Sequence, residues 1–330
     1  MRLFKVLAAV VIALSMTADG IGPARAASIP IDPHGDNAPK LNFERLAATA
    51  GEMPGTYTVP EPSAPGTEVY EQNIGILDYS NASDGYITLK YAGTTANMLG
   101  IVLIDPSGGR TQFTQMKADG NFAILPLVGG DGTYTIQFVE ILDSSGKSLL
   151  ILQTEVAVTL ADELSPFLIP NIEIDYRYAP DTVAGGALLT AASTTGLEKI
   201  AALYNYVSDN FTYNYDLADL IAAGALQTYS PNLDQVLAAK TGICYDMASV
   251  LVAMCRSQGI PCKLVKGVTT QAPYHAWVSV YSEEVGWIND IVSIDDPGWK
   301  MMDPTFAASG GDEGEAYSMV ATNYAPQKYY

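Results

Sequence analysis

The run from Cys244 to Ser257 restricts what this chain can fold into more than any other segment. If the run forms a helix, apolar side chains lie around most of its circumference, and such a helix is stable only when other elements bury it. Gly259 and Pro261 follow the run and are typical of a helix end. We therefore predict a centrally buried helix, with Cys244 at its exposed N-terminal end.

The position of Cys244 favours the thiolate form of its side chain. Free N–H groups and the dipole at a helix N-terminus stabilise an anion, and the thiolate is the nucleophilic form of cysteine. A nucleophile of this kind also needs a base and a group that orients the base. The chain has two histidines, and His34 lies in a Pro/Asp-rich stretch that we do not expect to fold. His275 is therefore the candidate base, and Asp303 the candidate that orients it.

The segments around this helix have helical and extended patterns. Apolar residues recur at helical spacing over 197–211, after a capping box formed by Thr195 and Glu198. A second short helix is predicted over 231–240. Strands are predicted at 262–268, 275–281, 285–294 and 299–303. If the last of these pairs antiparallel with the second, Asp303 lies beside His275.

Residues 67–160 have a different pattern, of short alternating runs separated by turns rich in Gly, Asp and Ser. Strands are predicted at 86–91, 99–104, 111–116, 122–127, 134–142 and 149–160. This pattern is typical of an immunoglobulin-like β-sandwich. A proline-containing segment at 161–181 then leads into the second domain. The predicted domains are 67–162 and 163–330.

The first 26 residues have the pattern of a signal peptide, with Arg2 and Lys5 before an apolar run at 6–13 and a small-residue cleavage site at 24–26. No later stretch reaches about 18 apolar residues, so no transmembrane segment is predicted. Residues 27–66 are predicted to be a tail or linker, and a role as a pro-segment is left open. We expect a secreted or extracellular protein, and leave open an association with the cell surface.

The charge balance limits the kinds of partner that the chain can bind. The chain holds 36 acidic and 17 basic residues, a formal net charge of −19, which argues against nucleic acid as a partner. No cofactor and no metal site is predicted. Calcium stays an open alternative through an acidic group whose spacing matches no calcium loop: Asp295, Asp296, Asp312, Glu313 and Glu315.

The cysteine count agrees with a reactive thiol. Three cysteines in an exported chain cannot all pair, so one at least is free, and Cys244 is the natural candidate. Cys255 and Cys262 are expected to be small core residues. A disulfide between these two is left open.

Three motifs, in this order, resemble the transglutaminase-like superfamily. They are Gly242-Ile243-Cys244-Tyr245-Asp246-Met247-Ala248, His275-Ala276-Trp277-Val278 and Met302-Asp303-Pro304-Thr305. The resemblance covers residues 195–306 and implies an α+β, papain-like core in which a cysteine helix packs on an antiparallel sheet. With the β-sandwich before it, the layout is similar to exported bacterial proteins that place an all-β module ahead of this core.

The resemblance implies a triad of Cys244, His275 and Asp303 that forms a thioester with an amide and passes the acyl group to water or to an amine. It also implies an upstream side chain that helps to hold the oxyanion, for which Tyr213 and Tyr215 are candidates. We expect a cysteine peptidase or amidase with a protein or peptide substrate, cell-wall or cell-surface material included. Two alternatives stay open: a protein-glutamine gamma-glutamyltransferase that crosslinks proteins, and a non-catalytic cell-surface binding protein with a vestigial triad.

Overall fold

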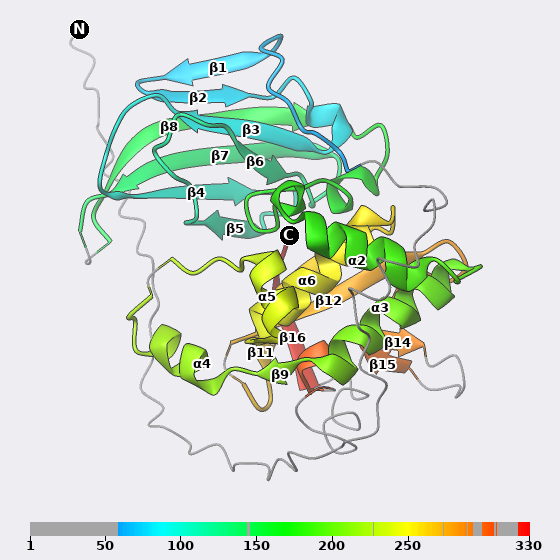
Figure 1. Ribbon diagram of the computed structural model, residues 1–330. Helices are drawn as coiled ribbons and strands as arrows, with labels where there is room; N and C mark the ends of the chain where they lie inside the picture. The colour runs from blue at the N-terminus through cyan, green and yellow to red at the C-terminus, as the bar shows by residue number, and fades with distance from the viewer. Residues whose placement is uncertain are drawn as a thin grey trace, which may run out of the picture. The chain divides into compact units, whose positions relative to one another are not determined.

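The computed structural model describes residues 59–330, apart from 144–145, 227, 273, 289, 293–298, 307 and 309–322. The described chain divides into two compact units, which Figure 1 shows in ribbon form. Residues 63–160 form the first unit, and residues 59–62 and 161–330 form the second. The predicted signal peptide and most of the predicted tail lie outside the described residues.

The first unit consists of two four-stranded sheets in which neighbouring strands pair antiparallel. The order in one sheet is β1-β2-β3-β6, formed by β1 (Val69–Gln72), β2 (Gly75–Asp78), β3 (Tyr86–Tyr91) and β6 (Ala123–Pro126). The order in the other is β5-β4-β7-β8, formed by β5 (Arg110–Phe113), β4 (Met98–Ile104), β7 (Gly132–Ile141) and β8 (Ser148–Val158). A short 3-10 helix, η1 (Ala82–Asp84), lies between β2 and β3.

The two sheets pack against each other through apolar side chains. Tyr91 of β3 meets Phe138 of β7 edge to face, with ring centroids 6.0 Å apart. Gly75 of β2 allows a close approach to β8, because a Cβ added there would lie 3.1 Å from side-chain atoms of Ile151 and Leu152. The six predicted strands are present, and β1 and β2 are additional. The immunoglobulin-like character stays a prediction, since the constant-type immunoglobulin sandwich divides its strands four and three.

The second unit is built around α6 (Cys244–Ser257), all of whose residues are buried. Helices α2 (Pro180–Thr190), α3 (Gly196–Asn210) and α5 (Leu233–Ala239) contact it, and so do strands β11 (Cys262–Thr269) and β12 (His275–Ser282) (Figure 1). The central helix that the sequence predicts is therefore confirmed. Because helices here accompany an antiparallel sheet, the predicted α+β class is confirmed as well.

The main sheet of this unit has the order β13-β12-β11-β16 and is antiparallel throughout. The remaining elements of the unit are β9 (Thr212–Tyr213), β10 (Thr241–Gly242), β13 (Gly286–Ile288), β14 (Asp290–Val292), β15 (Trp299–Met301), β16 (Tyr324–Tyr329), α4 (Tyr215–Ala222), η2 (Ser165–Phe167) and η3 (Tyr176–Tyr178). The sequence pattern does not predict α2, α4 or β16. It does predict the start of α3, where Thr195 and Glu198 form the expected capping box.

Strand register brings two distant parts of the chain together beside α6. His275 is the first residue of β12 and pairs with Gly267 of β11. Further along β12, Val278 forms an isolated antiparallel bridge with Met302 and donates its N–H to the Met302 carbonyl at 3.0 Å. The antiparallel arrangement that the sequence analysis requires is therefore present, and Asp303, the next residue, lies beside His275.

Candidate active site

Cys244 is the first residue of α6 and follows Ile243, the extended N-cap residue after β10. It sits where the first-turn N–H groups of the helix have no carbonyl partner within the helix. Only 8% of the residue is exposed. The helix end is therefore less open than predicted, and the thiol is largely enclosed by protein.

Asp246 fixes the start of α6. Its carboxylate is fully buried and accepts hydrogen bonds from the Ile243 N–H at 2.8 Å and from the Tyr229 hydroxyl at 2.7 Å. Burial raises the pKa of Asp246, and the two hydrogen bonds oppose that shift. Gly242 is needed before this turn, because a Cβ there would lie 2.5 Å from the Cβ of Asp246. The sequence motif around Cys244 is therefore also a helix-capping device.

His275 and Asp303 form a buried pair. The Nε2 atom of His275 lies 2.7 Å from Oδ2 of Asp303, and the two residues are 4% and 0% exposed. The ring centroid of Phe306 lies 4.8 Å from that of the imidazole, and the ring of Trp277 stacks with the imidazole at a centroid distance of 6.2 Å. Because Nε2 is engaged with Asp303, Nδ1 is the nitrogen left for the thiol of Cys244.

The charges around His275 favour its protonated form. Burial by itself would lower the pKa of His275, but the charges of Asp303 and Cys244 and hydrogen bonds to both raise it to about 10. An imidazolium is therefore favoured at neutral pH, with a carboxylate on one side and the cysteine on the other. The three residues that the sequence predicts as a triad thus lie together.

Asp303 has more hydrogen-bond partners than the sequence predicts. Its Oδ1 accepts from the N–H groups of Thr305 and Phe306 at 3.0 and 3.2 Å. Its Oδ2 accepts from the Tyr324 hydroxyl at 2.9 Å, and its backbone carbonyl accepts from the Tyr204 hydroxyl at 3.3 Å. An aspartate before a proline signals the first two contacts, since such residues form Asx turns. Nothing in the sequence signals the two tyrosines.

The two oxyanion candidates are placed differently. Tyr213 pairs with Gly242 across β9 and β10, so it lies beside the backbone that leads into Cys244. Burial, followed by the charge of Cys244, raises the pKa of Tyr213. Tyr215 is 55% exposed, and its ring packs edge-on against the ring of Tyr213 at 4.9 Å. Tyr213 is therefore the better placed of the two.

A buried ion pair lies next to the first turn of α6. Lys266 Nζ is 2.7 Å from Glu173 Oε2, and the Tyr245 hydroxyl donates to the same oxygen at 2.7 Å. The ammonium also lies 3.8 Å from the centroid of the Tyr245 ring and 4.7 Å from that of Tyr330. Since Tyr245 follows Cys244 directly, this cluster ties the start of α6 to β11. Sequence reasoning missed it, because a lysine inside an apolar strand has no visible partner.

Tyr274 adds an exposed aromatic surface beside the site. The residue precedes His275 and is 60% exposed. Partial burial, with the charges of Glu173 and Cys244, raises the pKa of Tyr274 to about 12. The thiol therefore has Tyr274 and Tyr213 as aromatic neighbours from separate segments of the chain.

The other two cysteines are core residues, as predicted. All three cysteines are free, and Cys255 and Cys262 are fully buried. A hydrogen bond to Cys262, together with burial, raises the pKa of the Cys255 thiol. The disulfide that the sequence left open is therefore absent between these two residues, and neither has the setting of a nucleophile.

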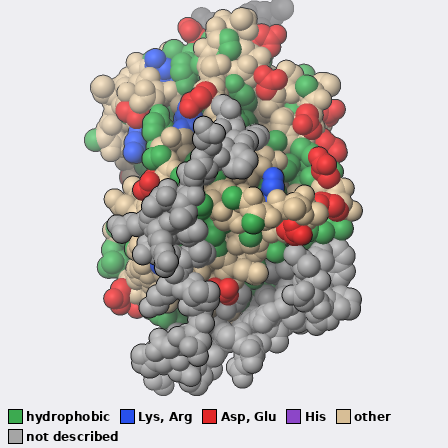
Figure 2. Space-filling model, turned by 45° about the vertical axis from the view of Figure 1, so that its right-hand side comes forward, with side chains coloured by type: hydrophobic (Ala, Val, Ile, Leu, Met, Phe, Trp, Pro, Cys, Tyr) green, Lys and Arg blue, Asp and Glu red, His purple; other side chains and the backbone are tan. Residues whose placement is uncertain are grey.

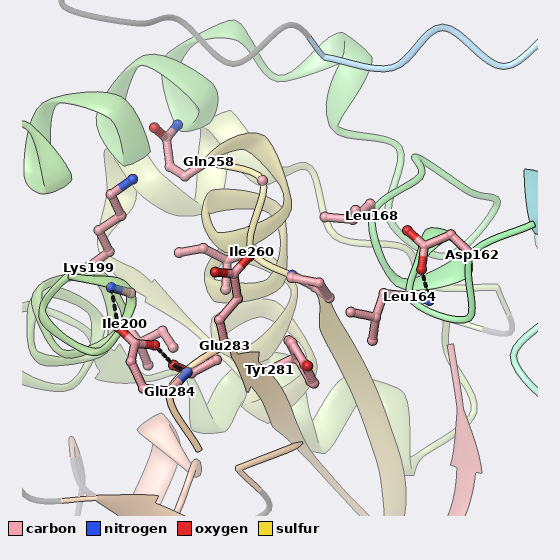
Figure 3. A pocket seen from close by; sticks show the side chains of 14 residues that line it. Asp162, Leu164, Leu168, Lys199, Ile200, Gln258, Ile260, Tyr281, Glu283 and Glu284 are labelled. Carbon is pink, nitrogen blue, oxygen red and sulfur yellow. Dashed lines mark hydrogen bonds between the residues drawn. The ribbon is translucent and has the colours of Figure 1, made fainter. Parts of the chain in front are cut away.

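A separate pocket of about 370 Å³ lies at the other end of α6 (Figure 3). Gln258, Lys199 and Tyr281 line it, and so does Glu284, which accepts the N–H of Gly196 at 2.9 Å. The 14-residue helix α6 separates this pocket from the thiol by about 20 Å, at 1.5 Å per residue. The pocket is therefore distinct from the site around Cys244.

The described surface carries many acidic groups. Figure 2 shows Asp and Glu side chains spread over the visible face, with few Lys and Arg side chains between them.

Within the described residues, no group of three or more His, Cys, Asp or Glu side chains could hold a metal ion. The acidic residues considered for calcium lie outside the described residues. No helix in the described part of the chain is long and apolar enough to cross a membrane.

A cysteine helix packed on an antiparallel sheet, with a histidine and an aspartate brought to the cysteine, defines a core similar to papain-like folds. Residues 185–290 match the family model of the transglutaminase-like superfamily. This part of the chain is therefore a transglutaminase-like core, which confirms the resemblance of the motifs. Cys244 and His275 lie within the matched residues, and Asp303 lies beyond them.

Known proteins similar to this chain are distant. Uncharacterized protein YebA from Bacillus subtilis (strain 168) is 29% identical over 118 residues, which cover 30% of this chain and 16% of YebA. The chain thus spans only a small part of the length of that relative.

Three solved structures are also similar to this chain. A candidate cysteine protease from Cytophaga hutchinsonii has a TM-score of 0.36 at 13% identity, over 79% of this chain and 78% of its own. The periplasmic domain of TgpA from Pseudomonas aeruginosa has a TM-score of 0.31 at 14% identity, over 74% and 100%. Red sea bream transglutaminase has a TM-score of 0.28 at 13% identity, over 70% and 49%. Scores of this size carry no argument about the activity of this chain.

Proposed function

We propose that this chain is an exported cysteine acyl-transfer enzyme that cleaves amide or peptide bonds through a thioester on Cys244. The observation that carries the proposal is the buried imidazole of His275, which is bonded to Asp303 at 2.7 Å and also hydrogen-bonded to Cys244. A histidine held between a carboxylate and a thiol is the arrangement that generates a thiolate nucleophile.

The proposed reaction has two halves. The Cys244 thiolate attacks the amide carbonyl, and the oxyanion that forms accepts hydrogen bonds from the Cys244 N–H and the Tyr213 hydroxyl. The His275 imidazolium then protonates the leaving amine as the C–N bond breaks, which leaves the thioester. In the second half, neutral His275 takes a proton from water as the water oxygen attacks the thioester. The acid leaves, and the thiolate and imidazolium are restored.

Water is the proposed acceptor because it is the default nucleophile outside the cell. An amine acceptor would use the same thioester, so a crosslinking enzyme differs from a hydrolase in its second half only. The proposed substrate is a protein or peptide, cell-wall or cell-surface material included. The signal-peptide pattern of residues 1–26 supports export.

The test uses the purified protein and a Cys244→Ala variant, with casein peptides as the amide probe and monodansylcadaverine as the amine probe. We expect peptide cleavage by the wild type and none by the variant, with a covalent acyl adduct on Cys244 in mass spectra of the quenched reaction. Transfer of the acyl group to the amine in preference to water would identify a crosslinking enzyme. A wild type that forms no adduct with any probe would favour the non-catalytic binding protein.

A further inference from the structure

We propose that Tyr324 is a positioning residue for Asp303, so that strand β16 completes the thiol site. This inference rests on the proposed function of Cys244, His275 and Asp303. Tyr324 lies outside the residues that match the superfamily model, which end at residue 290, and outside the three sequence motifs.

The hydroxyl of Tyr324 and the imidazole of His275 bind the same oxygen of Asp303. The Tyr324 hydroxyl donates to Oδ2 at 2.9 Å, and His275 Nε2 lies 2.7 Å from that oxygen. The second oxygen, Oδ1, accepts from the N–H groups of Thr305 and Phe306. With donors on both oxygens, the carboxylate cannot rotate about its Cβ–Cγ bond without breaking hydrogen bonds in a site that excludes water.

Packing fixes the position of the Tyr324 ring. The residue is 8% exposed, and its ring meets Trp277 edge-on at 5.2 Å. Trp277 in turn stacks on His275. The backbone of Tyr324 pairs with Thr269 at the start of β16. The phenol is therefore held by the sheet and by the aromatic group that also supports the imidazole.

A donor on the carboxylate oxygen has two chemical effects. The hydroxyl holds Oδ2 in place beside His275 through a hydrogen bond to a charged group, which is stronger than one between neutral groups. It also directs the Oδ2 lone pair that remains toward the imidazole, and this orients His275 for the thiol. Loss of the hydroxyl should weaken both effects without removing any group that touches substrate.

The test compares Tyr324→Phe with the wild type and with Tyr329→Phe. Tyr329 lies on the same strand and is 42% exposed, so its variant controls for a change in β16. The readout is the rate of iodoacetamide labelling of Cys244 from pH 4 to 9, with peptide mapping. For Tyr324→Phe we expect labelling about tenfold slower at pH 6, since a hydrogen bond to a charged group is lost. We also expect the acid side of its pH–rate profile to move about one pH unit higher, because a less firmly held Asp303 stabilises the imidazolium of His275 less. Tyr329→Phe should show no change.

The outcomes separate this inference from the proposed function. Fast labelling of the wild type, with an identical pH profile in Tyr324→Phe, would overturn the role of Tyr324 and leave the proposed function intact. A Tyr324→Phe variant without near-ultraviolet circular dichroism would also overturn it, because the hydroxyl would then support the whole core. A wild type that is not labelled at pH 6 would overturn the proposed function, and the positioning role with it.

Discussion

At the scale of single residues, His275 is central to the site because its ring is hydrogen-bonded both to the carboxylate of Asp303 and to the thiol of Cys244. Asp303 and Cys244 together raise its pKa to about 10 against the effect of burial. Each of the two should therefore change the titration of His275 when it is removed.

The titration of His275 can be followed directly, because the chain holds only two histidines. We expect Cys244→Ala to lower the pKa of His275 from the wild-type value, since the thiolate charge is lost, and Asp303→Asn to lower it further. The measurement is the imidazole nitrogen shift in NMR spectra of histidine-labelled protein between pH 4 and 11. Equal pKa values of His275 in all three proteins would contradict its electrostatic coupling to Asp303 and Cys244.

The same shift makes stability depend on pH. The folded pKa of about 10 lies above the ordinary value of 6.5, so the contribution of His275 is fully present below about pH 6.5 and is lost as the pH rises through 10. We expect the melting temperature of the wild type to fall across this window more steeply than that of Asp303→Asn. Parallel curves for the two proteins would mean that the pair does not affect folding.

The buried pair of Lys266 and Glu173 makes a separate prediction. Lys266→Met should destabilise the second unit by about 3–5 kcal/mol, because Glu173 would be left charged and buried. The double change Lys266→Met and Glu173→Leu should recover much of this loss. Urea unfolding, followed by tryptophan fluorescence, measures the free energy of unfolding of the single and the double variant.

A matched control is the more exposed pair of Arg177 and Asp175, whose side chains are 17% and 30% exposed. Exposed pairs contribute about 0–1 kcal/mol, so Arg177→Met should cost far less than Lys266→Met. A similar cost for the two variants would show that burial does not decide the energetics of these pairs.

At the scale of elements, strand β16 depends on one close contact. A Cβ at Gly267 would lie 2.4 Å from the carbonyl oxygen of Ala325 and 3.0 Å from the Cα of Pro326. The register between β11 and β16 also shifts at this point. β16 can reach its position only because residue 267 is a glycine.

Gly267→Ala should therefore push β16 away from β11 and lower the free energy of unfolding by about 1–3 kcal/mol. Because β16 carries Tyr324, labelling of Cys244 should slow as well. The control is Gly286→Ala, which has open space for a Cβ but a φ of +80° and should cost stability without changing the labelling rate. Unchanged labelling in Gly267→Ala would contradict the link between β16 and the thiol.

The sequence predicts those elements whose local residue pattern is enough to specify a helix or a strand. The apolar circumference of α6 and the capping box of α3 are both local signals, and both elements are present as predicted. Helix α2 is not predicted, since two adjacent glycines oppose a helix. One of them, Gly186, allows a close approach to α6: a Cβ there would lie 3.3 Å from the Cα of Met254. A tertiary contact therefore overrides the local preference.

The candidate site divides in the same way. The sequence predicts Cys244, His275 and Asp303 because each lies at a locally recognisable position. Cys244 begins a helix, His275 begins a strand, and Asp303 ends a predicted strand. The contact of Tyr324 depends on which strands become neighbours, and the pair of Lys266 and Glu173 depends on a loop that packs against β11. Neither contact has a local signal in the sequence.

At the scale of the whole molecule, the chain divides into two compact units, and each buries apolar side chains of its own. All the described site residues lie in the second unit, and so do the three tryptophans of the chain. Tryptophan fluorescence therefore reports on the unit that holds the thiol.

Phe138→Ala removes a fully buried ring from the first unit and should destabilise it by about 3–5 kcal/mol. We expect the far-ultraviolet circular dichroism transition to shift to lower temperature. The tryptophan transition and the labelling of Cys244 should stay as in the wild type. An equal shift of both transitions would mean that the chain unfolds as one cooperative unit.

The most direct test of the thiol site is the pH dependence of iodoacetamide labelling on the folded wild type, with peptide mapping of all three cysteines. An imidazolium held beside the cysteine predicts fast labelling at pH 6 that is confined to Cys244, while the buried Cys255 and Cys262 stay unmodified until the protein unfolds. Slow labelling of Cys244 that appears only above about pH 8.5, the range of an ordinary thiol, would contradict an activated nucleophile.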